Sequence, residues 1–131
     1  GFTGAVGTIV VTRDDAGLWA DSRYWVQAEA QLAGTGIVLM KLSSGAGTQY
    51  IDWLATHLQP GQSLAVDGQV VGLAFLRALR AALEARGIRL RTDLDLPGQI
   101  WSDRPGRPTP PVYEHRPPQA PLGRAAKLEA L

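Results

Sequence analysis

The placement of proline divides this chain more sharply than any other feature of its sequence. Seven of the nine prolines lie between Pro105 and Pro121. Proline lacks the backbone N–H and holds φ fixed, so this stretch cannot run as a helix or as a central strand. We expect an extended, polyproline-like connector there. The sequence before it is long and apolar enough for one domain, and residues 123–131 become helix-forming again after it.

This pattern predicts three parts. Residues 1–103 form a domain whose start is missing, residues 104–122 form the Pro-rich linker, and residues 123–131 begin a second domain with its first helix. The chain opens at Gly1 rather than at Met and enters a strand-like run within a few residues. We therefore expect it to be a fragment of a longer protein.

Charge and composition exclude several classes of function. The net charge is +1, whereas a general binder of nucleic acid would show a strongly basic face. There is no cysteine, so neither a disulfide framework nor a cysteine zinc site is possible. No apolar run approaches the roughly 20 residues that span a bilayer, and no signal peptide with a basic start opens the chain. We expect a soluble, cytoplasmic protein without a nucleic-acid or membrane partner.

Before the linker, the hydrophobic period alternates between that of strands and that of helices. The first two strands, over residues 5–12 and 18–20, are joined by a turn over residues 13–17 and so predict a β-hairpin. The later elements are a helix capped by Asp21 or Ser22, a strand over 37–41, a helix after Thr48, a strand over 63–66, a helix from 73 to a C-cap at Gly87, a strand over 88–90 and a helical turn over 97–101.

These elements predict an α/β fold of three layers, with a mostly parallel mixed sheet and an initial antiparallel hairpin. The first helix is expected to bury Trp25, Val26, Ala28 and Leu32. The helical turn is expected to pack Ile100 and Trp101 back on the domain. Core packing is the default expectation for all four tryptophans, Trp19, Trp25, Trp53 and Trp101.

The residues offer little catalytic or metal-binding equipment. His57 lies near a predicted helix C-terminus and His115 in the linker, and we expect both to be solvated. Asp14 and Asp15 form a turn pair, and Ser43 and Ser44 have no neighbouring base and are expected in a loop. A metal site needs several converging ligands. We therefore assign no catalytic and no metal residue to this chain.

A series of short segments nevertheless resembles one enzyme family in order and spacing. The run from Phe2 to Thr12 is similar to the FTGSAGT-x-VVT segment of Xaa-Pro aminopeptidases in the creatinase/prolidase/aminopeptidase P group, and residues 18–28 are similar to their LWTDGRYFLQA. Further matches are residues 39–41 (LMK), 52–54 (EWL in the family), 65–67 (GVDP) and 100–105 (IW-x-DRP). Together they cover essentially the whole chain.

The resemblance implies a larger enzyme with two creatinase-type N-terminal domains and then a catalytic domain. Family members hold two divalent metals, usually manganese, through Asp, Asp, His, Glu and Glu, and release the N-terminal residue of peptides with proline second. This chain would be the first domain, without the opening helix and strand, and the catalytic domain would be absent. We expect it to be inactive alone, to shape the substrate cleft of its parent and to belong to a homo-oligomer. An open edge beside residues 5–12 would also invite pairing with another chain, so we expect this fragment to self-associate.

The resemblance also singles out Arg23. In the family, the matching arginine reaches the active-site cleft and contacts the bound peptide. A guanidinium suits this role because it offers planar, permanently charged donors to a carbonyl or carboxylate. The structural alternative is a surface arginine in the first turn of a helix, where the dipole gives it no advantage. The chain departs from the family at Ala20, Ser22 and Trp25, which replace Thr, Gly and Phe; Ser22 is less free than glycine to adopt positive φ.

Two other interpretations remain open. The chain could be a domain of a creatinase or prolidase-type hydrolase with a different substrate, although these shorter relatives lack the second N-terminal domain toward which the linker leads. It could also be a stand-alone α/β interaction module. A reading frame that continues past Leu131 into a segment rich in His, Asp and Glu would argue against the module.

Overall fold

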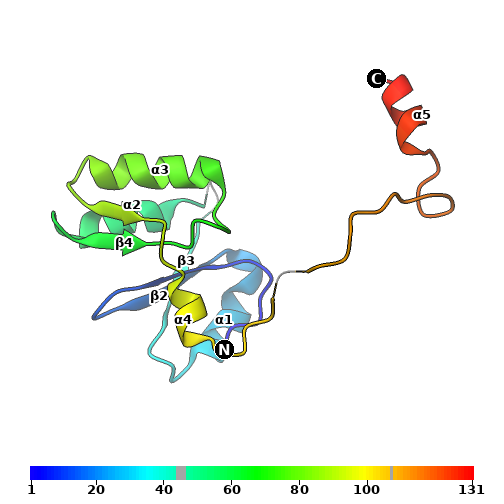
Figure 1. Cartoon of the computed structure of the whole chain (residues 1–131). Coiled ribbons are helices and arrows are strands. Elements are labelled where there is room, and N and C mark those ends of the chain that lie inside the picture. Colours follow the sequence, from blue (N-terminus) through cyan, green and yellow to red (C-terminus); the bar gives the residue numbers. More distant parts are fainter. Residues whose placement is uncertain (44–46, 107) are drawn as a thin grey trace. The chain divides into compact units, whose positions relative to one another are not determined.

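The computed structural model describes residues 1–43, 47–106 and 108–131. The chain divides into two compact units, Gly1–Ile100 and Trp101–Leu131, which are described separately (Figure 1). Ser44, one of the two serines expected in a loop, and Arg107 of the Pro-rich segment lie outside the described residues.

The predicted hairpin is present. Strand β1 (Thr8–Val11) runs antiparallel to β2 (Ala16–Ala20), and β3 (Val38–Lys41) lies parallel to β2, in the order β1-β2-β3. Thr12 closes the turn: its backbone N–H donates to the Asp15 carbonyl at 2.8 Å, and its hydroxyl oxygen accepts from Asp15 N–H at 2.9 Å.

A second, parallel sheet joins β4 (Ser63–Ala65) to β5 (Arg89–Arg91). The mixed α/β class with its hairpin and parallel pairs is thus confirmed, but the strands form two sheets rather than one. The helices of the first unit are α1 (Trp25–Leu32), α2 (Gln49–His57), α3 (Leu73–Glu84) and α4 (Leu96–Ile100). A 3₁₀ helix, η1 (Ser22–Tyr24), precedes α1.

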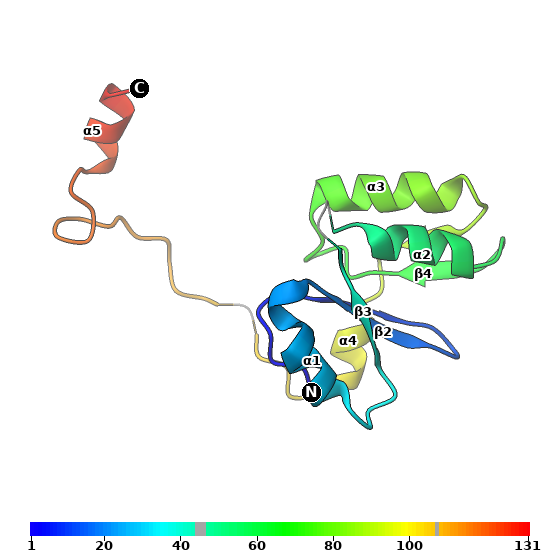
Figure 2. The same cartoon turned by 180° about the vertical axis from the view of Figure 1, so that it is seen from behind.

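The core lies on both faces of β2. Successive side chains of a strand point to opposite faces, so Leu18 and Trp19 enter different clusters. Leu18 packs with Ala28 and Leu32 of α1. Trp19 packs on the other face against α2 and α3, which lie side by side (Figure 2), in a cluster formed by Val10, Trp19, Ile51, Leu54, Leu79, Leu83 and Ile88. The sheet is therefore a middle layer between helices.

Two packing expectations are wrong. Val26 is 82% exposed because α1 buries Ala28 and Leu32, one helical turn apart, and Val26 lies nearly opposite Ala28 on the helix. Ile100 and Trp101 are also exposed rather than buried. Ile100 ends α4, which has only five residues and none of them buried, and Trp101 belongs to the second unit.

The second unit contains the Pro-rich segment and helix α5 (Arg124–Glu129). The described residues between Ser102 and Leu122 form neither helix nor strand, as their prolines require. Arg124 N–H at the start of α5 donates to Glu114 Oε1 at 3.1 Å, so the segment folds back locally on the helix.

A cavity of about 500 Å³ lies between the two sheets of the first unit. Its lining includes Val11 of β1, Leu64 of β4, and Trp53 and Leu54 of α2.

Among the described residues, β1 pairs only with β2 and β4 only with β5. Thr12 and Asp15 form a hydrogen-bonded pair, and such pairs alternate with non-hydrogen-bonded pairs along an antiparallel ladder. The N–H and C=O groups of Ile9 and Val11 therefore point away from β2.

We propose that the open edge of β1 makes this chain self-associate, because an uncharged strand with unpaired N–H and C=O groups can pair with another chain. The average mass from light scattering should rise with concentration. Val11, which is 66% exposed, offers the test: Val11→Lys places a charge on the edge strand and should return the mass toward the monomer. Val26→Lys on α1 is the matched control and should associate like the wild type. A monomeric wild-type chain at high concentration would contradict the proposal.

Candidate functional site

Arg23 lies in the turn that carries the chain from β2 into α1. β2 ends at Ala20, Asp21 is extended with ψ of 170°, and η1 begins at Ser22. Of the two predicted caps, Asp21 takes the role: its Oδ1 accepts from Arg23 N–H at 3.1 Å. No residue other than glycine has a positive φ among those described, so the turn does not need the glycine that Ser22 replaces.

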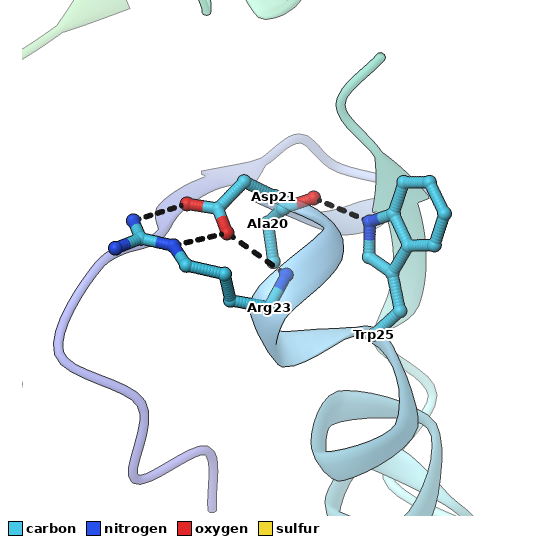
Figure 3. A network of polar contacts seen from close by, with 4 residues as sticks. All are labelled: Ala20, Asp21, Arg23 and Trp25. Atoms are coloured by element: carbon cyan, nitrogen blue, oxygen red, sulfur yellow. Dashed lines mark hydrogen bonds and ion pairs between the residues drawn. The ribbon is translucent and has the colours of Figure 1, made fainter. Parts of the chain in front are cut away.

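The Asp21 carboxylate also binds the side-on edge of the Arg23 guanidinium, formed by Nε and Nη2 (Figure 3). Arg23 Nε donates to Oδ1 at 2.9 Å and Nη2 donates to Oδ2 at 2.7 Å. The Arg23 side chain is 69% exposed, and the guanidinium carbon lies 5.5 Å from the centre of the Tyr24 ring. A two-pronged pair at these distances holds the charged group in one orientation while leaving it accessible to solvent.

Aromatic residues anchor the turn on both sides. Trp25 Nε1 donates to the carbonyl of Ala20 at 2.9 Å, which ties the first residue of α1 to the last residue of β2 (Figure 3). The Tyr24 ring packs edge-on against Phe2, with 5.9 Å between ring centres. Lys41 at the end of β3 lies 5.3 Å from the Trp25 ring and pairs with Glu29 at 2.6 Å. The turn that carries Arg23 is therefore held by contacts with Phe2, with β2 and with β3.

A cavity of about 700 Å³ adjoins this turn. It lies where β2 and β3 end, and its lining includes Asp21, Ser22, Trp25 and Tyr50. Crevices at the carboxyl ends of parallel strands are where open α/β sheets commonly bind ligands. In Figure 3 the Arg23 guanidinium and the Trp25 indole project to opposite sides of the turn, so Arg23 flanks this cavity rather than lining it.

The pair has a pH dependence of known sign. The side-chain hydrogen bond from Arg23 lowers the pKa of Asp21 below 3.8, and the same bond raises the pKa of Arg23. The Asp21–Arg23 pair is therefore fully formed above the ordinary pKa of an aspartate, and it is lost as the pH falls through the lowered pKa of Asp21. The carboxyl carbon of Asp21, followed by NMR, should titrate with a pKa below that of an ordinary aspartate, and this pKa should rise in Arg23→Ala. Equal midpoints in the two proteins would contradict the pairing.

The other candidate residues stay apart from this turn. His57 is the last residue of α2 and is exposed, with Nδ1 2.8 Å from the Trp53 carbonyl and its ring stacked on Trp53 at 3.9 Å. His115 is exposed in the second unit beside Tyr113. Asp14 and Asp15 are exposed at the hairpin turn. In the part of the chain that the structure describes, no three His, Asp or Glu side chains come close enough to hold a metal ion.

The tryptophans differ from one another in role. Trp19 is buried and contacts the rings of Tyr50 and Trp53, as expected of a core residue. Trp53 and Trp25 are half-buried, and Trp25 adds the hydrogen bond that braces the turn. Sequence reasoning missed this bracing role and the side-on grip of Asp21 on Arg23. The available signal was the short spacing between an N-cap aspartate and an arginine two residues later, which places both side chains on one turn.

The comparisons with known proteins agree with this architecture. The family model of the creatinase/prolidase N-terminal domain matches residues 1–95, so the chain belongs to that family. Its curated relatives are Xaa-Pro aminopeptidases. Aminopeptidase P2 of Arabidopsis thaliana is 34% identical over 134 residues, which covers 100% of this chain and 19% of the relative. Human Xaa-Pro aminopeptidase 2 is 32% identical over 115 residues, covering 86% of this chain and 17% of the relative.

Solved structures give the same result. The X-prolyl aminopeptidase of Caenorhabditis elegans, described as a cytosolic enzyme with a di-nuclear active site, matches with a TM-score of 0.71 at 30% identity. The match covers 80% of this chain and 17% of that one. The X-Pro aminopeptidase of Thermotoga maritima matches with a TM-score of 0.51 at 25% identity, over 70% of this chain and 25% of that one. The chain thus spans less than a fifth of the length of the curated relatives cited here.

None of the described helices is both long and apolar enough to cross a bilayer.

Proposed function

We propose that this chain is a non-catalytic N-terminal domain of a metal-dependent Xaa-Pro aminopeptidase, and that Arg23 contacts the bound peptide. The observation that carries the proposal is the accessible Arg23 guanidinium, held in one orientation by Asp21 at the end of β2. A donor held in advance loses little conformational entropy when it binds an oxygen, which makes it suited to positioning a substrate. The family of the relatives supplies the substrate class: peptides with proline second.

We further propose that the parent enzyme holds two divalent metals, expected to be manganese, in a catalytic domain outside this chain. The described residues of this chain do not gather a set of metal ligands. The domain would shape the substrate cleft and support a homo-oligomer in the cytoplasm. The di-nuclear site of the Caenorhabditis elegans enzyme supports the two metals, and its cytosolic description supports the cytoplasmic location.

The first test compares this chain with the longest reading frame that contains it. Both are incubated with manganese and a short Xaa-Pro-Xaa peptide, and release of the N-terminal residue is followed by chromatography. We expect cleavage by the long form and none by this chain, because this chain lacks a metal-binding cluster among its described residues. Cleavage by neither protein would contradict the aminopeptidase function and favour a stand-alone interaction module. Cleavage by this chain alone would contradict its non-catalytic role.

A further inference from the structure

Asp21 leaves a specific part of the Arg23 guanidinium open. A guanidinium carries five N–H donors. Asp21 takes the Nε proton and one Nη2 proton, so its carboxylate covers the side-on edge of the group. The second Nη2 proton and one Nη1 proton form the adjoining, end-on edge, and the other Nη1 proton points to the third edge, beside Cδ. Because the Arg23 side chain is 69% exposed, a ligand oxygen can reach this end-on edge.

The carboxylate also changes which oxygen binds well there. Asp21 and Arg23 together carry no net charge, since both remain ionised near neutral pH. A neutral carbonyl oxygen gains the hydrogen bonds of the end-on edge without repulsion from Asp21. A carboxylate gains the same bonds but brings a second negative charge close to the Asp21 carboxylate, where like charges repel.

Asp21 is well placed both to hold the Arg23 guanidinium and to repel a carboxylate. It is the less exposed member of the pair, and its Oδ1 is fixed by the backbone N–H of Arg23 as well as by Nε. The turn itself is held by the bond from Trp25 to the Ala20 carbonyl. A carboxylate anchored in this way keeps the guanidinium, and its own charge, at a constant place relative to an arriving peptide.

We propose that Asp21 is a positioning and specificity-determining residue that directs the end-on edge of Arg23 to a neutral peptide carbonyl and disfavours a free carboxylate. The proposal rests on the proposed function, in which Arg23 contacts the peptide. It predicts that the enzyme prefers a peptide with a blocked or extended C-terminus over the matched peptide with a free C-terminal carboxylate close to proline.

The test uses the long reading frame with manganese and two probes, Ala-Pro-Ala with a free carboxylate and the same tripeptide as its C-terminal amide. The variant is Asp21→Asn, which preserves shape and the capping oxygen but removes the charge. Loss of the acceptor for Nη2 should lower kcat/KM for both peptides. The ratio of kcat/KM for the amide to that for the acid should fall by about threefold to tenfold, because the repulsion acts on the acid alone.

Two controls separate the possible failures. Asp14→Asn removes the same charge at the exposed hairpin turn and should leave the ratio at its wild-type value. Arg23→Ala should lower kcat/KM for the amide. If Arg23→Ala lowers it but Asp21→Asn leaves the ratio unchanged, the inference about Asp21 is overturned and the proposed function stands. If Arg23→Ala changes neither peptide, the contact proposed for Arg23 is itself overturned.

Discussion

Replacing Trp19 by alanine should remove about 3–5 kcal/mol from the free energy of unfolding of the first unit. Trp19 lies on β2, the central strand of the three-stranded sheet, and only 3% of it is exposed. Its ring meets Trp53 at 5.3 Å and Tyr50 at 6.3 Å between centres, both close to edge-on. Alanine would leave a cavity between the sheet and α2. Single domains have a net stability of about 5–15 kcal/mol, so a large fraction of the stability would be lost.

Urea denaturation followed by circular dichroism measures this effect, and the midpoint should fall sharply in Trp19→Ala. Trp101→Ala is the matched control, because Trp101 belongs to the second unit and is 52% exposed. Its removal should change the free energy of unfolding by less than about 0.5 kcal/mol. Equal midpoints for the two variants would contradict the placement of Trp19 in the core.

The local structure of this domain follows closely from its sequence. The hairpin forms where β-branched residues flank a polar turn, and α1 is followed by Gly34 and Gly36, both at positive φ. Gly87 likewise lies at φ of +70° after α3. These features depend on neighbours in sequence, which is why pattern alone predicts them.

Features that depend on distant contacts were not predictable in this way. The division into two sheets depends on which edges meet, and nothing in β1 or β4 alone specifies an unpaired edge. Trp101 is as apolar as Trp19, so composition could not show that it lies outside the core. Asp21 was predictable as a cap, but its side-on grip on Arg23 depends on side-chain torsions that sequence does not reveal.

Replacing Arg23 by alanine should lower kcat/KM of the long enzyme about tenfold to a hundredfold. Hydrogen bonds from a charged donor contribute about 1.5–3 kcal/mol, and their loss reduces the binding of the transition state by that amount. Stability should change little, because the Arg23–Asp21 pair is exposed and solvent screens such pairs. A loss of activity without a loss of stability would therefore assign Arg23 to the substrate rather than to the fold.

The most direct test of the substrate contact proposed for Arg23 is kcat/KM of the long reading frame on a Xaa-Pro-Xaa peptide. It is measured for the wild type, Arg23→Ala and Arg13→Ala. Arg13 is exposed at the hairpin turn, so Arg13→Ala removes the same charge away from the candidate site. We expect Arg13→Ala to match the wild type and Arg23→Ala to fall at least tenfold below it. An Arg23→Ala enzyme as active as the wild type would show that this domain contributes no substrate contact through Arg23.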